Sequence, residues 1–265
     1  MTKVDSWQVD ALWIYLRMVM SGQLHGLAQG TRAPFQRVVD NKPYPMEVEA
    51  LEKILRIRDR LQNSRQEITL EDHGAGSGKL PQRRTVGSIH HSSAVPHWWG
   101  VFLFRLVREL KPKTVLELGA NMGVSGAYIQ SGLDLNGGPG RFTTIEGDPT
   151  LASIARETLD SLGKGKGEVV HGRFQDALLP VLKQSGELDL VFIDGHHEYQ
   201  PTLDYFDRIE PFLAANATIV FDDVYIWSRP VRKAWKQIIR THPATMPIDL
   251  ARFGILVWRE FPKPT

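Results

Sequence analysis

The chain has 265 residues, 42% of them apolar, which is enough to build one large α/β domain with an N-terminal extension. Its formal net charge is only +2, so the overall charge gives no reason to expect a nucleic-acid partner. The absence of cysteine excludes disulfides and thiolate metal sites, and it fits the cytoplasmic location that we expect.

Residues 1–96 are expected to form a helical N-terminal extension. Apolar residues recur at helical spacing over 7–20 and 46–68. The first of these segments is too short to span a bilayer and contains Arg17, so we expect no membrane partner. We expect it to pack on the main domain or on a second subunit, and the second case would produce a homo-oligomer through the N-terminal helices.

The segment 71–96 is rich in glycine, serine, histidine and arginine and is predicted to be a loop or a short helix. Two interpretations stay open for it. It is a linker, or its histidines (His73, His90 and His91) belong to a lid over a site.

Residues 97–265 alternate between strand and helix patterns, which predicts a doubly wound α/β domain with a parallel sheet and right-handed crossovers. The expected strands are 114–118, 141–146, 168–171, 188–193, 217–222 and 254–258, and the expected helices are 98–110, 123–133, 149–162, 176–184, 201–213 and 229–240.

The most informative stretch reads TVLELGANMGVSG and covers residues 114–126. An apolar strand that contains Glu117 leads into a turn with Gly119 and Gly123, and glycines at such a turn let the backbone approach a ligand. The next strand ends in Glu146, and an acidic side chain there can accept hydrogen bonds from both hydroxyls of a ribose. The pattern therefore predicts an adenosine-containing cofactor.

The spacing of this turn favours S-adenosylmethionine (SAM) over a dinucleotide. The dinucleotide fingerprint is G-x-G-x-x-G, and here Asn121 stands where its middle glycine would be. The carboxylate of Glu117 would also repel a pyrophosphate, whereas it suits the amino group of a methionine-derived cofactor.

These residues resemble the class I SAM-dependent methyltransferases, whose signature is E-x-G-x-x-x-G followed by an acidic strand end. The resemblance implies a Rossmann-like seven-stranded sheet in which a last strand inserts antiparallel. It also implies a set of cofactor-binding residues, although Phe174 and Asp176 are equally interpretable as a core residue and a helix cap. The set is Glu117, Gly119, Ala120, Asn121, Gly123 and Ser125 for the methionine end, Glu146, Gly147 and Asp148 for the ribose, Phe174 and Asp176 for the adenine, and Asp194 beside them.

Acidic residues also follow two later strands. Asp194 comes after strand 188–193, and Asp222 and Asp223 come at the end of strand 217–222. Three carboxylates at adjacent strand ends repel one another unless a proton or a cation intervenes, and such oxygen ligands suit Mg²⁺, Mn²⁺ or Ca²⁺. The alternative is that Asp222 caps a helix or pairs with Arg229 or Arg232.

Over residues 98–258 the chain looks like the cation-dependent O-methyltransferases, typified by the catechol and caffeoyl-CoA enzymes, and most like their bacterial subgroup with an I-D-G-x-H-x-Y segment. The resemblance implies that Asp194, Asp222 and Asp223 hold one divalent ion. It places His197 where other members have a catalytic lysine, as a base, a substrate contact or a residue bonded to a neighbouring loop. The chain departs from the family before strand five, where Ala215-Asn216-Ala217 replaces a Gly-Gly pair.

The sequence thus predicts divalent-cation-assisted O-methylation of a small hydroxylated molecule, with His197 and Asp194 as catalytic residues. A metal-independent N-methyltransferase and a SAM-binding regulatory subunit without turnover are the alternatives. Aromatic residues that would line an acceptor site are equally interpretable as core; they are Trp98, Trp99, Tyr199, Tyr225 and Trp227. The acceptor itself is not identified by the sequence.

Overall fold

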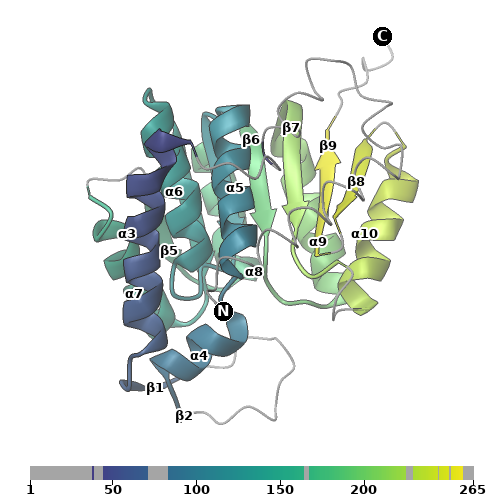
Figure 1. Cartoon of the computed structure of the whole chain (residues 1–265). Coiled ribbons are helices and arrows are strands. Elements are labelled where there is room, and N and C mark those ends of the chain that lie inside the picture. Colours follow the sequence, from purple (N-terminus) through teal and green to yellow (C-terminus); the bar gives the residue numbers. More distant parts are fainter. Residues whose placement is uncertain are drawn as a thin grey trace.

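The computed structural model describes residues 38, 44–70, 83–163, 167–224, 229–243, 245–250 and 252–258 (Figure 1). The helix expected over 7–20, His73, and the aromatic residues Tyr225 and Trp227 lie outside these ranges. No helix within the described ranges is both long and apolar enough to cross a membrane.

A seven-stranded sheet forms the centre of the molecule, with the strand order β5-β4-β3-β6-β7-β9-β8. The five strands from β5 to β7 are parallel, whereas β9 runs antiparallel between β7 and β8. This arrangement confirms the predicted methyltransferase type of sheet and its inserted last strand. The strands are β3 (Thr114–Leu118), β4 (Arg141–Glu146), β5 (Gly167–His171), β6 (Leu188–Ile193), β7 (Leu213–Phe221), β8 (Met246–Leu250) and β9 (Phe253–Val257).

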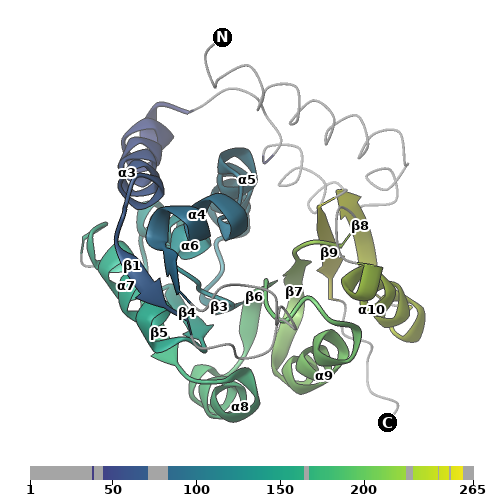
Figure 2. The same ribbon diagram turned by 90° about the horizontal axis from the view of Figure 1, so that it is seen from below.

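Helices cover both faces of the sheet, as Figure 2 shows in a view down the strands. One apolar cluster joins α5 (His97–Leu110), α6 (Val124–Asn136) and α7 (Pro149–Asp160) to one face. A second cluster joins α8 (Phe174–Ser185), α9 (Tyr199–Ile209) and α10 (Arg229–Thr241) to the other, with the short 3-10 helix η1 (Glu210–Phe212) after α9. The sheet is therefore doubly wound, as the alternating pattern predicted.

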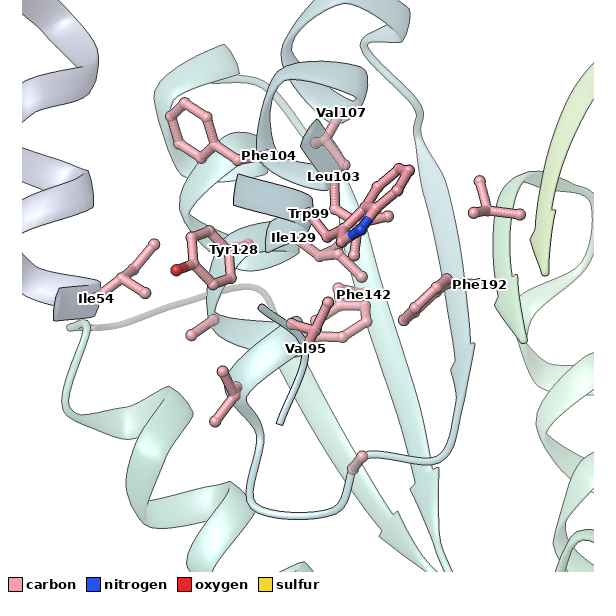
Figure 3. Packing of buried hydrophobic residues seen from close by; sticks show 14 of the residues in the cluster. Ile54, Val95, Trp99, Leu103, Phe104, Val107, Tyr128, Ile129, Phe142 and Phe192 are labelled. Atoms are coloured by element: carbon pink, nitrogen blue, oxygen red, sulfur yellow. The ribbon is translucent and has the colours of Figure 1, made fainter. Parts of the chain in front are cut away.

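The described part of the N-terminal extension packs on the first layer. Helix α3 (Pro45–Gln62) lies outside α5 and α6, and Figure 3 shows its Ile54 facing Tyr128 of α6. Glu47 of α3 also forms a buried ion pair with Arg105 of α5, at 3.1 Å between Oε2 and Nη2. Packing on the main domain is therefore observed for α3, while association with a second subunit stays a prediction.

The N-terminal part of the predicted element pattern differs from the structure in two places. The helix expected over 46–68 ends at Gln62, because the side chain of Asn63 donates to the carbonyl of Asp59 at 2.9 Å and the chain then enters β1 (Glu67–Thr69). Within the segment 71–96 the predicted short helix is found as α4 (Val86–Ser93), but β2 (Arg83–Thr85), which pairs with β1, was not predicted.

Candidate functional site

The turn between β3 and α6 lies against the carboxyl end of β6. Gly119 has φ +101°, and a Cβ there would collide with the carbonyl oxygen of Asp194, so only glycine fits. Gly123 has φ +77° and begins α6 in the left-handed conformation. Between them Asn121 takes φ +47° and its side chain donates to Ser93 Oγ of α4 at 3.0 Å. The end of α4 is therefore beside the turn.

Glu146 at the end of β4 holds two backbone groups of this region. Its Oε2 accepts from the Asn121 N–H at 2.7 Å, and its Oε1 accepts from the Asp148 N–H at 3.0 Å. Burial raises the pKa of Glu146, and these backbone hydrogen bonds oppose the rise. Asp148 caps α7 by accepting from the Leu151 N–H at 2.8 Å, so its side chain has a structural role as well as its predicted cofactor role.

Glu117 is buried completely beneath the first turn of α6, and neither of its carboxylate oxygens has a hydrogen-bond partner. Burial raises its pKa to about 7; the neighbouring hydroxyls of Ser125 and Thr144, which do not reach full hydrogen-bond geometry, offset this only in part, and the charge of Glu146 raises it further. A buried carboxyl without partners is costly, by roughly 1–3 kcal/mol or more. A cationic amino group beside the turn would remove this cost, and that is the cation predicted for Glu117.

The two residues expected at the adenine differ in burial. The ring of Phe174 is 9% exposed and packs edge-on against His196 and Tyr205, with centroids 5.7 and 5.3 Å away. Asp176 is exposed in the first turn of α8, where a negative charge favours the helix dipole. Their cofactor contacts stay predictions.

Three carboxylates and two basic side chains meet at the ends of β6 and β7. The imidazole of His197 lies 3.6 Å from Asp194 Oδ1 through Nε2 and 3.6 Å from Asp223 Oδ2 through Nδ1. Arg252 Nη2 lies 2.5 Å from Asp222 Oδ2 and 3.4 Å from Asp223 Oδ1. The sequence therefore placed Asp194, Asp222, Asp223 and His197 correctly in one cluster, and it missed Arg252.

Electrostatics in this cluster are dominated by burial. Burial raises the pKa of Asp194 to about 7, and the charge of Arg252 lowers it while that of Asp223 raises it. Burial and the charge of Asp194 also raise the pKa of Asp222 well above its usual range. Burial opposes the charge of Arg252, but the attraction of these carboxylates outweighs it and raises the pKa of the guanidinium.

The donor set does not fit the predicted divalent ion. Asp222 accepts from Arg252 at Oδ2 and from the N–H of Asp223 at Oδ1, the latter at 2.7 Å, so a cationic side chain already lies where the predicted ion would bind. Across the described residues, no three acidic, histidine or cysteine side chains are arranged to hold a metal ion. The pairing of Asp222 with Arg229 or Arg232 is also not what is found, because Arg252 takes that role.

Other histidine and aromatic side chains of the chain make different contacts. His196 pairs through Nδ1 with the hydroxyl of Tyr205 at 2.6 Å. The hydroxyl of Tyr199 donates to Gln237 of α10, and Lys233 Nζ lies 4.5 Å from the centroid of the Tyr199 ring. Trp99 is a core residue, 2% exposed among the apolar side chains of Figure 3, and it packs on Phe253. Trp98 is half-buried, and its ring lies tilted against that of Trp99. His90 is buried within α4, and His91 is exposed.

Comparison with known proteins finds similarity to methyltransferases. Residues 116–224 match a family model described as a methyltransferase domain. A relative from Mycobacterium sp. (strain KMS) with O-methyltransferase in its name is 36% identical over 104 residues, 38% of this chain and 45% of the relative. A catechol O-methyltransferase from Niastella koreensis is 30% identical over 127 residues, 47% of this chain and 55% of that protein.

The chain thus spans about half the length of the curated relatives it matches. Among solved structures, the cofactor-bound protein Rv0187 from MTB has a TM-score of 0.57 and 25% sequence identity, covering 83% of this chain and 100% of that one. Residues 116–224 of this chain are therefore similar to a methyltransferase domain, and the chain is similar in sequence to proteins named O-methyltransferase.

Proposed function

We propose that this protein is a SAM-dependent O-methyltransferase acting on a small hydroxylated molecule, such as a catechol-like natural product or a sugar hydroxyl. The observation that carries the proposal is the pair of carboxylates at the glycine turn, of which Glu117 is fully buried and Glu146 half-buried. Glu146 stands at the end of β4, where it would hold a ribose, and Glu117 is buried without a partner beneath the turn. When bound, SAM supplies the methyl group from its sulfonium.

The acceptor would be activated by the cluster at the ends of β6 and β7. Methyl transfer from a sulfonium is an in-line displacement, so the protein has to orient the acceptor oxygen and remove its proton. His197 is the accessible member of the cluster, with 40% of its side chain exposed, and histidine is the side chain suited to general-base chemistry near neutral pH. Asp194 and Asp223 on either side of the imidazole would orient it and stabilise its protonated form.

Methyl transfer to oxygen rather than nitrogen is favoured by the relatives, which are named O-methyltransferase. Metal assistance, expected from the resemblance, is not supported by the donor set, because Asp222 is committed to Arg252 and to a backbone N–H. We therefore propose O-methylation in which the chain's own basic side chains supply the positive charge at the acceptor.

Calorimetric titration with S-adenosylhomocysteine (SAH), set against NAD, tests the cofactor. We expect saturable SAH binding, no NAD binding, and at least tenfold weaker SAH binding in Glu146→Ala. Methyl transfer from radiolabelled SAM to a panel of catechols, phenols, sugars and amines then tests the acceptor class. Transfer to amines alone would favour the N-methyltransferase alternative, and SAH binding without turnover on any acceptor would favour the regulatory one.

A further inference from the structure

We propose that Arg252 is the resident cation of the carboxylate cluster, in the place for which the family resemblance expects a divalent ion, and that this site binds no metal. The inference concerns the same site as the proposed function. It rests on the contacts of Arg252 and does not depend on the identity of the methyl acceptor.

The backbone fixes Arg252 at this position. The residue lies between β8 and β9, in the tight connection where its N–H donates to the carbonyl of Leu250 at 2.8 Å. Its own carbonyl accepts from the N–H of Val224 at 2.9 Å, which ties the β8–β9 connection to the chain that leaves β7. The side chain is therefore delivered to the end of β7 by two hydrogen bonds that do not involve the guanidinium.

The guanidinium meets the carboxylates at the positions a cation would need. Nη2 contacts Asp222 Oδ2 at 2.5 Å and Asp223 Oδ1 at 3.4 Å, and the side chain of Arg252 is only 16% exposed. Asp222 is fully buried, and a carboxylate buried in this way has to be paired. The guanidinium thus takes the position beside Asp222 and Asp223 where a divalent ion would have to lie, and its positive charge opposes the binding of a second cation there.

The guanidinium charge of Arg252 would also stabilise negative charge that develops on the methyl acceptor. The Nε of Arg252 is buried and has no hydrogen-bond partner among the described residues. Arginine keeps its charge at every physiological pH and presents donors in a fixed fork, so it can act as an electrostatic group without proton exchange. The carboxylates of Asp222 and Asp223 would then hold the arginine in place, which is a different task from ligating an ion.

Manganese binding tests this inference directly, since Mn²⁺ is detected by electron paramagnetic resonance without any turnover. Protein freed of metal with a chelator is titrated with Mn²⁺ alone, as wild type, Asp222→Asn, Arg252→Ala and Arg252→Ala/Asp222→Asn. We expect the first two to behave alike, Arg252→Ala to bind one Mn²⁺ at least tenfold more tightly, and the double variant to lose that gain. Arg240→Ala, which removes an exposed arginine from α10, serves as the matched control and should behave as wild type.

The inference is overturned if wild type binds one Mn²⁺ that Asp222→Asn abolishes, or if folded Arg252→Ala binds no better than wild type. Should Arg252→Ala fail to fold, the comparison of wild type with Asp222→Asn still decides, and Arg252→Lys tests whether a positive charge alone keeps Mn²⁺ out. SAH titration of the same proteins separates the two proposals. If wild type does not bind SAH, the proposed function is contradicted, whereas the Mn²⁺ result still stands.

Discussion

Replacing Glu117 with glutamine is expected to stabilise the protein and to weaken cofactor binding at the same time. The carboxyl is fully buried, and burial raises its pKa from 4.5 to about 7. A raised pKa means that the folded state holds the proton more tightly than the unfolded state, so stability falls as pH rises from 4.5 to 7. The loss is complete above pH 7, where it amounts to at most about 3 kcal/mol.

Glutamine keeps the size of the side chain and removes the charge, so Glu117→Gln should raise the free energy of unfolding at pH 8 by about 2–3 kcal/mol. The gain should vanish at pH 4. The lost negative charge should weaken SAH binding by more than tenfold, because the amino group of the ligand loses a buried ionic partner. Urea unfolding at pH 4 and pH 8, together with calorimetry, measures both effects.

Glu157→Gln is the matched control, since it makes the same chemical change on the exposed face of α7 and should alter neither quantity. If Glu117→Gln is less stable than wild type at pH 8, Glu117 does not carry a destabilising unpaired charge in the folded protein, and the reasoning is refuted. Unchanged SAH affinity would show that the charge of Glu117 does not contribute to cofactor binding.

Other expectations concern the rest of the site and its support. Glu146→Ala should weaken SAH binding by about 1.5–3 kcal/mol in calorimetry and lower the melting temperature, because two backbone N–H groups lose their acceptor. His197→Ala should lower kcat by about 10²–10⁴-fold with unchanged SAH affinity, and a loss of affinity in place of rate would assign it to binding. Glu47→Ala should cost about 3 kcal/mol in urea unfolding because it leaves the Arg105 charge buried, and Glu47→Ala/Arg105→Met should recover part of that loss. Burial and the charge of Arg58 lower the pKa of His97 to about 4, so stability should fall as pH drops from 6.5 towards 4, and His97→Gln should reduce that fall by on the order of 1–2 kcal/mol.

The parallel half of the fold could be predicted because each of its elements has a strong local signal. Strands β3, β4 and β6 were placed at their observed bounds, since each is a short apolar run between clear turn residues. Strand β8 was missed because its five residues include a proline and an aspartate, and its burial alternates. Strand β7 begins earlier than predicted, at Leu213, and Asn216 with φ +66° interrupts its ladder where the family has glycines.

The candidate site was predicted where chemistry follows directly on a strand. Asp194 and Asp222 sit at such positions, so parallel pairing brings them together. Arg252 could not be found in this way, because its position depends on the β8–β9 hairpin returning beside β7. Its signal was a basic residue in a short connection between the last two strands, which becomes informative only after β8 is recognised.

The contact between Gly119 and Asp194 has a consequence for engineering. The carbonyl oxygen of Asp194 occupies the space that a side chain at 119 would take, and the N–H of Asp194 donates to the carbonyl of Leu118 at 2.9 Å. The glycine turn proposed to bind SAM and the cluster proposed to bind the methyl acceptor therefore touch each other, and their separation depends on the absence of a side chain at position 119. The added Cβ of Gly119→Ala would push the turn away from Asp194, so under the proposed function it should lengthen the distance from the methyl group of SAM to the acceptor oxygen as well as weaken SAM binding.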